Sequence, residues 1–239
     1  PWNEGFSATS FVDFDTNPGH MQPAQNGSED NLSLKLVERG GTITSPNARV
    51  VLEVSQANLN GLLKHMVDGR DNAFEMNVPG GTGIIFRIDL GGRFGVNRIR
   101  FSPRVGFEDN FLRGYQLALN DGSDEQRTVS GAPDLRVLKV AERNLDPIVD
   151  IPIPLQFVRY IQVKQLVRGQ WEIDEFEIFG EGFASSASSL SRVFDQNRPA
   201  VFGNLTWSMG TIGEPTKVRA TVATRSGTTA DPTDSLAWS

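Results

Sequence analysis

The stretch Gly83–Gly91, GIIFRIDLG, sets the pattern by which the rest of the chain can be interpreted. Its apolar residues occupy alternate positions, at Ile84, Phe86, Ile88 and Leu90. Because successive side chains of a strand point to opposite faces, this spacing is typical of a strand with one face in a core. The pair Gly91-Gly92 predicts a break, and a second strand is expected over Val96–Phe101.

The same alternation recurs along the chain. It marks strands at Tyr115–Leu119, before the turn Asn120-Asp121-Gly122, and at Phe157–Leu166 and Ile173–Phe179. Pro152 and Pro154 place Ile151–Leu155 at a sheet edge or in a connection, since proline cannot donate to a central ladder. Many short strands separated by turn residues predict an all-β sandwich or jelly roll.

The first third of the chain is more varied. Residues 1–30 are polar with scattered aromatic residues, and we expect an extended arm that is mobile or laid on a partner surface. Alternation predicts strands at Asn31–Val37 and Arg49–Ser55, whereas the spacing of apolar residues in Gln56–Met66 predicts one or two helical turns.

Composition narrows the functional classes. Apolar residues make up 38% of the chain, and no run approaches the ~20 residues of a membrane span. The 23 basic and 29 acidic residues give a net charge of −6, which argues against a nucleic-acid partner. The absence of cysteine excludes disulfides and zinc–thiolate sites.

Five segments, in order, resemble the discoidin-like (galactose-binding-like) domains, which include coagulation-factor C-type domains and bacterial carbohydrate-binding modules. They are Val67–Ala73 (VDGRDNA), Gly83–Gly91, Gly114–Gly122 (GYQLALNDG), Phe157–Val163 (FVRYIQV) and Trp171–Gly180 (WEIDEFEIFG). The resemblance implies an eight-stranded jelly roll over residues 41–183 whose loops at one end hold a ligand. Residues 1–40 are then an arm and first strand.

A small-residue linker is predicted at residues 184–190. Strands expected at Val201–Trp207 and Lys217–Ala223 make residues 191–239 part of a second, incomplete β-sandwich. This tail resembles the fibronectin-like segments of large secreted bacterial proteins. The resemblance implies a secreted or cell-surface location.

The discoidin-like resemblance also implies a structural calcium ion. Its ligands here would be Asp68 and Asp71 of the first loop and Glu175 of the closing strand, because calcium prefers several oxygen ligands. Ala73 stands where the family has a threonine, so one hydroxyl ligand is missing. An ordinary Asx-type turn is the alternative interpretation.

Two loops are candidates for ligand binding. Pro103–Arg113 offers an aromatic platform with polar neighbours, a combination suited to a sugar ring or to a protein contact. Its candidate residues are Arg104, Phe107, Glu108, Asn110 and Phe111. Arg168 and Trp171 form the second candidate loop. The alternative is that Phe107 and Phe111 cap the sandwich and that Trp171 packs at the edge of the core.

Catalysis has little support in the sequence. The two histidines, His20 and His65, have no nucleophile motif nearby and no metal-ligand spacing. Two hypotheses remain. The first is a non-catalytic module that binds a glycan or cell-surface polymer; the second is a structural subunit that binds copies of itself through the N-terminal arm and C-terminal strands.

Overall fold

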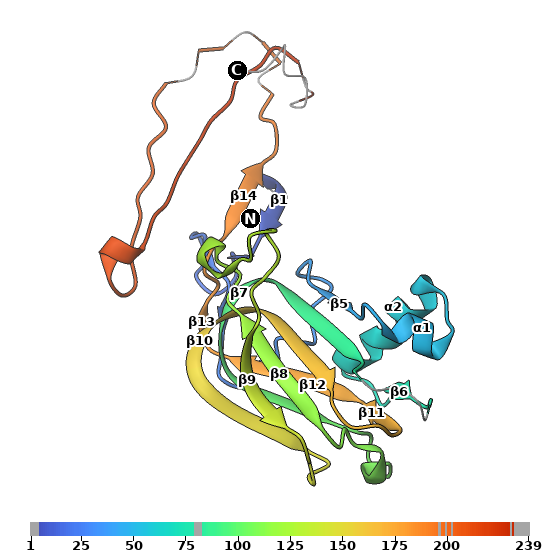
Figure 1. Cartoon of the computed structure of the whole chain (residues 1–239). Coiled ribbons are helices and arrows are strands. Elements are labelled where there is room, and N and C mark those ends of the chain that lie inside the picture. The colour runs from blue at the N-terminus through green and yellow to red at the C-terminus, as the bar shows by residue number, and fades with distance from the viewer. Residues whose placement is uncertain are drawn as a thin grey trace.

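The structure is a computed structural model that describes residues 5–78, 83–195, 197–198, 200–201, 203–229 and 231. The body is an all-β sandwich with two short helices at one side (Figure 1). Its strands are β5 (Thr42–Thr44), β6 (Phe74–Met76), β7 (Ile85–Ser102), β8 (Tyr115–Asn120), β9 (Arg136–Ala141), β10 (Val149–Gln165), β11 (Trp171–Ile173) and β12 (Glu175–Gly180). The fold class predicted from the alternation is confirmed.

Two long bent strands, β7 and β10, belong to both layers of the sandwich. The main sheet has the order β12-β7-β10-β8-β9, with β5 also on β7. The first half of β7 pairs with β5 and the second half of β10, whereas its second half pairs with β12 and the first half of β10. The layers meet face to face, because Phe86 of the first half lies edge-on to Phe176 of β12, with ring centroids 5.8 Å apart.

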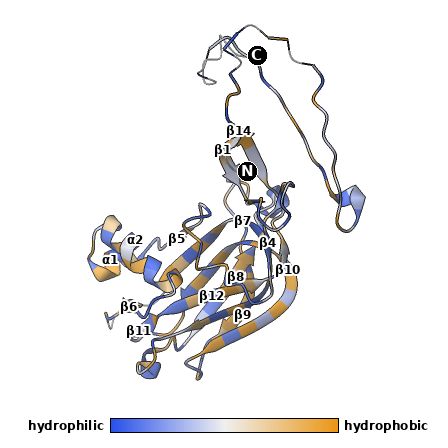
Figure 2. Ribbon diagram, turned by 180° about the vertical axis from the view of Figure 1, so that it is seen from behind, coloured by the Kyte–Doolittle hydropathy of each residue, from blue (hydrophilic) through white to orange (hydrophobic). Residues whose placement is uncertain are grey.

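The core follows from the alternation of side chains along these strands. Hydrophobic and hydrophilic bands alternate along the ribbons in Figure 2. In β12 every second residue is buried, and Phe176 and Ile178 are fully enclosed. Phe101 stacks on Phe176 at 5.4 Å and lies edge-on to Tyr115 at 5.3 Å, which ties β7, β8 and β12 into one aromatic cluster.

The predicted break at Gly91-Gly92 is wrong, because β7 runs through it without interruption. Gly91 has a φ of +80°, and a Cβ at this position would lie 2.7 Å from the carbonyl oxygen of Arg39. The glycine pair therefore lets the strand bend under a crossing segment. The edge position predicted for Pro152 is confirmed, since that part of β10 pairs with β7 while β8 pairs only with residues 160–165.

Two other predicted strands are also wrong. Residues 32–40 form successive turns in which Leu32 and Leu36 are buried while Leu34 is 49% exposed. Residues 48–52 form helix α1 (Ala48–Leu52), in which Val50 faces solvent. In both segments alternate apolar residues do not share one face.

The predicted helix is confirmed as α2 (Gln56–Lys64), continued by the 3₁₀ turn η2 (His65–Val67). The hydroxyl oxygen of Ser55 accepts a hydrogen bond from the N–H of Asn58, which satisfies one free donor of the first turn. Leu59 and Leu63 lie one turn apart and are buried against the sandwich.

The arm lies on the sandwich of its own chain. Its short strands are β1 (Phe6–Ser10), β2 (Val12–Asp13), β3 (Gln22–Pro23) and β4 (Gln25–Asn26), and the closing segment adds β13 (Gly182–Phe183) and β14 (Ser188–Ser191). Phe11 packs edge-on against Phe94 at 5.3 Å, and the N–H of Leu32 donates to the carbonyl oxygen of Ile178. β4 pairs with β13, and β1 pairs with β14 in a two-stranded ribbon that projects from the body (Figure 1).

In the part of the chain that the structure describes, no strand follows β14. The described residues of Val201–Trp207 and Lys217–Ala223 are exposed and outside any sheet, and the 3₁₀ turn η5 (Pro215–Lys217) lies between them. Neither expected strand forms in the described residues of these segments. The linker at residues 184–190 and the second domain stay predictions.

Candidate functional site

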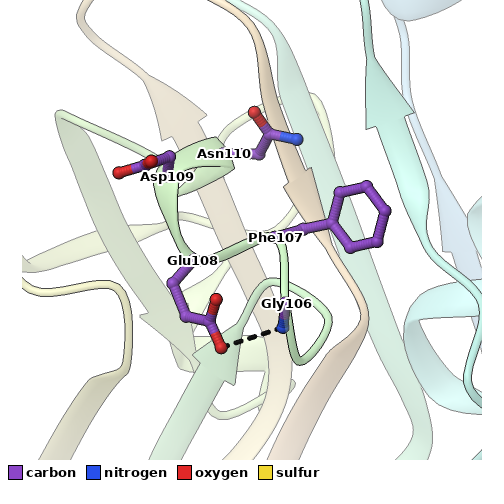
Figure 3. A pocket seen from close by; sticks show the side chains of 5 residues that line it. All are labelled: Gly106, Phe107, Glu108, Asp109 and Asn110. Carbon is purple, nitrogen blue, oxygen red and sulfur yellow. Dashed lines mark hydrogen bonds between the residues drawn. The ribbon is translucent and has the colours of Figure 1, made fainter.

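The loop between β7 and β8 forms a turn at the end of the sandwich away from the arm. The 3₁₀ turn η3 (Glu108–Asn110) closes it, and Gly106–Asn110 line an open depression of about 300 Å³ (Figure 3). The side chains of Phe107 and Glu108 point to different sides of this turn. The carboxylate of Glu108 accepts a hydrogen bond from the N–H of Gly106 at 2.9 Å, so it stabilises the turn itself.

Arg104 joins this loop to the strand pair β6 and β11. Its backbone N–H and its Nε each donate to Oε1 of Glu172 at 3.0 Å, and Nη2 donates to Oε2 at 2.8 Å. The guanidinium also pairs with Glu75. Glu172 and Glu75 lie opposite each other in the β6–β11 register. Arg104 therefore neutralises two carboxylates that would otherwise repel across the strands.

The electrostatics of this group follow from burial and pairing. The side chain of Glu172 is only 2% exposed. Burial alone would raise the pKa of Glu172, but hydrogen bonds and charge from Arg104 outweigh it and hold the pKa below its ordinary value. The same hydrogen bonds raise the pKa of Arg104. Both groups are thus charged and locked in place at neutral pH.

Phe107 is the exposed aromatic residue of the loop. Its side chain is 47% exposed, and the guanidinium carbon of Arg104 lies 4.4 Å from the ring centroid. A guanidinium held by two carboxylates is a rigid support for the ring. The result is a flat apolar surface with polar groups beside it, at a position that solvent reaches.

The other candidate residues of these loops are more dispersed. Phe111 is buried and packs under Arg113, whose guanidinium lies 4.4 Å from the ring. Trp171 is also buried, between Phe74 and Phe86, so the structure gives it a core position instead of a place on the loop surface. Arg168 is exposed in the turn before β11.

Asn110 is half-buried and lies close enough to Glu172 to favour its ionised form. Arg104, Phe107 and Asn110 are therefore brought together, whereas the carboxylate of Glu108 is bound to the backbone of its own turn and Phe111 is buried.

No sequence pattern marks Glu172 and Glu75 as residues of the site. A charged residue between Trp171 and Ile173 is typical of the exposed face of an alternating strand, but Trp171, Glu172 and Ile173 are all buried. Only the arginine in the adjacent loop explains this burial, and nothing in the sequence links Arg104 to a residue 68 positions later.

The predicted calcium ligands are Asp68 and Asp71 of the first loop, of which Asp71 is exposed, and Glu175 at the start of β12. Glu175 is half-buried, and neither of its carboxylate oxygens has a hydrogen-bond partner among the described residues. Burial, with the charges of Asp174 and Asp68, raises the pKa of Glu175 to about 7. The N–H of Gly69 favours the ionised form but does not reach hydrogen-bond geometry.

The donors of the first loop fit a calcium ion only in part. Asp68 accepts hydrogen bonds from the N–H of Arg70 and the Nδ2 of Asn72, at 3.1 and 3.2 Å, and the buried Oδ1 of Asn72 has no partner among the residues that the structure describes. No three acidic or histidine side chains of the described residues converge closely enough to form a ready metal centre. Glu175, the Asn72 oxygen and backbone carbonyls would have to supply the ligands.

Neither histidine lies in the Pro103–Arg113 loop. The Nδ1 of His65 is 3.2 Å from the carbonyl oxygen of Ala73, a contact that ties η2 to the first loop, and His20 is exposed in the arm.

No described helix is long and apolar enough to span a bilayer.

The bent β7 and β10 strands, shared by two face-packed layers, form a β-sandwich of the kind that the sequence motifs predict, and a chitosan-binding module and a fucolectin are among the solved structures similar to the chain. No protein-family model matches the sequence, and no curated protein sequence matches it either.

Three solved structures illustrate the likeness. Chitosan-binding module 1 of a Paenibacillus sp. IK-5 chitosanase/glucanase is 18% identical, with a TM-score of 0.47, and the alignment covers 64% of this chain and 100% of that one. A fucose-binding module of Streptococcus pneumoniae is 19% identical, with a TM-score of 0.43 and coverage of 65% and 99%.

The third is a Clostridium perfringens module in complex with GalNAc-β-1,3-galactose, at 17% identity, a TM-score of 0.41 and coverage of 59% and 94%. At such identities and TM-scores the likeness does not identify a ligand of this chain.

Proposed function

We propose that this chain is a non-catalytic carbohydrate-binding module of a larger secreted or cell-surface protein. The observation that carries the proposal is the half-exposed ring of Phe107, supported by a guanidinium that two carboxylates hold in place. Aromatic faces bind the C–H side of a sugar ring, and adjacent polar groups pair with its hydroxyls.

The test is a glycan array followed by titration of the strongest binder. The panel includes chitosan oligosaccharides and glycans with terminal galactose, N-acetylgalactosamine and fucose. We expect Phe107→Ala to weaken binding about 3- to 10-fold, the worth of one aromatic contact. Phe194→Ala is the matched control, because Phe194 is 75% exposed in the tail. An array without any binder would refute the proposal.

A structural calcium ion at Glu175 is part of this proposal. The two carboxylate oxygens without partners are its support, since a buried carboxylate is costly unless a cation or donor compensates it. The ion would hold the first loop against β12 and would take no part in ligand chemistry.

A second candidate function is a structural subunit of a surface layer or filament, assembled through the arm and the C-terminal strands. One observation favours it: the β1–β14 ribbon is exposed, carries no charged residue, and leaves strand edges open to pairing within the described residues. Sedimentation velocity at micromolar concentrations tests it, because a strict monomer contradicts assembly.

A further inference from the structure

The bend of the sandwich, at the end opposite the Phe107 loop, carries a second exposed aromatic residue. Phe157 of β10 is 46% exposed and lies opposite Gly95 in the β7 register. Leu155, two residues before it, is 54% exposed and lies against Gly95, where a Cβ would come within 3.2 Å of its Cδ1. Isolated exposed apolar residues are common, but here two neighbours share one small area.

Arg93 holds this aromatic residue in the way that Arg104 holds Phe107. Its guanidinium carbon lies 5.2 Å from the ring centroid of Phe157, and its Nη2 forms a 3.1 Å salt bridge with Asp121. The other oxygen of Asp121 accepts a hydrogen bond from the N–H of Ser123 at 2.8 Å. The ring, guanidinium and carboxylate are thus fixed by three segments far apart in the sequence.

The charges at this position are stable at neutral pH. Burial opposes ionisation of Asp121, but the hydrogen bonds from Ser123 and the charge of Arg93 keep its pKa below the ordinary value. Among the described residues, the Nε of Arg93 is buried without a hydrogen-bond partner, but the side chain is 35% exposed, so a ligand can reach part of the guanidinium. The carboxylate retains acceptor capacity beside it.

The topology separates the two sites. Both ends of β7 lie at the end of the sandwich that carries the loop Pro103–Arg113, because the strand bends back between them. Gly91–Gly95 and Phe157 lie at the bend, next to the arm (Figure 1). One chain therefore presents the same three-part arrangement at opposite ends.

We propose that Phe157, with Arg93 and Asp121, forms a second carbohydrate-binding platform. A pyranose ring would pack its C–H face on Phe157 and Leu155, and its hydroxyls would pair with the guanidinium and the carboxylate. This inference rests on the proposed function. Its consequence is that one chain binds a polysaccharide at two places, so that affinity for a polymer exceeds affinity for a short oligosaccharide.

Affinity electrophoresis of the full chain in gels containing soluble chitosan, a galactan or a fucan tests the platform. We expect Phe157→Ala and Phe107→Ala each to weaken retention by the bound polymer about 3- to 10-fold, and the double variant to lose nearly all of it. Phe157→Tyr keeps a flat ring and should bind like the unaltered chain. Phe194→Ala is again the control.

Each outcome separates this inference from the proposed function. Unaltered binding by Phe157→Ala, with weakened binding by Phe107→Ala, overturns the second platform and leaves the proposed function standing. Weakening by Phe157→Ala alone supports the platform and removes the Phe107 site. A chain that binds none of the three polymers refutes both. Should Phe157→Ala unfold, Phe157→Leu, which keeps apolar volume without a flat ring, replaces it.

Discussion

Arg104 links folding and the candidate site in a single side chain. Its guanidinium supports the ring of Phe107 and also compensates Glu172, whose side chain is almost fully enclosed. A buried carboxylate without its partner costs far more than an exposed one, because water cannot solvate it. The proposed binding surface is therefore coupled to the stability of the β6–β11 pair.

We expect Arg104→Ala to lower the free energy of unfolding by about 3 kcal/mol, since it leaves Glu172 buried and unpaired. Arg104→Ala combined with Glu172→Ala should recover part of the loss, because the unpaired charge is gone. Urea denaturation measures both. Arg127→Ala, which removes an exposed pair with Asp124, is the control, with an expected change of about 0.5 kcal/mol or less. If Arg104→Ala lowers the free energy of unfolding by less than about 1 kcal/mol, Arg104 does not compensate a buried charge on Glu172.

Glu175 predicts an unusual dependence of stability on pH. Its pKa is raised to about 7 in the folded chain, above the ordinary 4.5, so the unfolded chain ionises first as pH rises. Stability is then highest below about pH 4.5 as far as this group is concerned, and it falls as pH rises toward 7. At about 1.4 kcal/mol per pKa unit, the loss is of order 1–3 kcal/mol.

In a chelator we therefore expect a lower melting temperature at pH 8 than at pH 5, and Glu175→Gln should remove most of the difference. Calcium should raise the melting temperature at pH 8 in the unaltered chain and not in Glu175→Gln. Glu125→Gln, at an exposed carboxylate, is the control. Identical melting temperatures with chelator and with calcium would show that this protein binds no structural calcium ion.

At the scale of elements, the packing of β7 against β12 depends on glycine. A Cβ on Gly180 would lie 1.8 Å from the carbonyl oxygen of Gly95, a backbone atom that cannot move aside. This contact explains why the closing motif WEIDEFEIFG ends in glycine. Close approach of two strands is a common reason for glycine within a sheet.

Gly180→Ala should lower the free energy of unfolding by at least about 2 kcal/mol, because β12 must shift away from β7. Gly61→Ala is the matched control: its Cβ meets no atom within 4 Å on α2, and alanine should stabilise the helix by about 0.5–1 kcal/mol. Chemical denaturation of both variants checks the opposite signs. Equal effects would show that glycine content, and not the β7–β12 contact, decides the result.

The observed elements also show where sequence patterns are enough to predict secondary structure. Alternation located strands such as β12 because one face of the strand lies in the core. It failed at Asn31–Val37, where Leu32 and Leu36 are four residues apart in a chain of turns, and at Arg49–Ser55, where Val50 faces solvent. Short alternating runs do not distinguish a strand from turns, since the partners that decide the conformation lie elsewhere in the sequence.

The candidate site was predictable to a smaller extent. Arg104 and Phe107 are predicted to lie on one loop, because turn residues separate the two strands on either side of them. The partners Glu75 and Glu172 come from two other strands, and their contact with Arg104 depends on the register of β6 and β11. Register is a property of the folded sheet, so no local pattern reveals it.

At the scale of the whole molecule, the arm and the tail should differ in stability. The arm is tied to the sandwich by backbone hydrogen bonds and by Phe11, whereas the described residues after β14 are exposed throughout. Segments with few buried contacts open easily and are cleaved first.

Limited trypsin digestion should therefore cut first after Lys217 and Arg219 and only later after Arg39, whose following residues Gly40 and Gly41 are hydrogen-bonded in turns. Mass spectrometry of the fragments gives the order of cleavage. The shortened chain should keep the melting temperature of the full chain. Resistance of the tail would indicate a partner that covers it and would favour the assembly hypothesis.

The β1–β14 ribbon has a mechanical consequence. Gly5 and Arg192 lie side by side, with the N–H of Arg192 donating to the carbonyl oxygen of Gly5 at 2.8 Å. Tension on the two flanking segments would therefore act across the ribbon and separate its hydrogen bonds one after another, which needs little force. The ribbon would therefore separate, and the flanking segments would lengthen, before the tension acted on the sandwich.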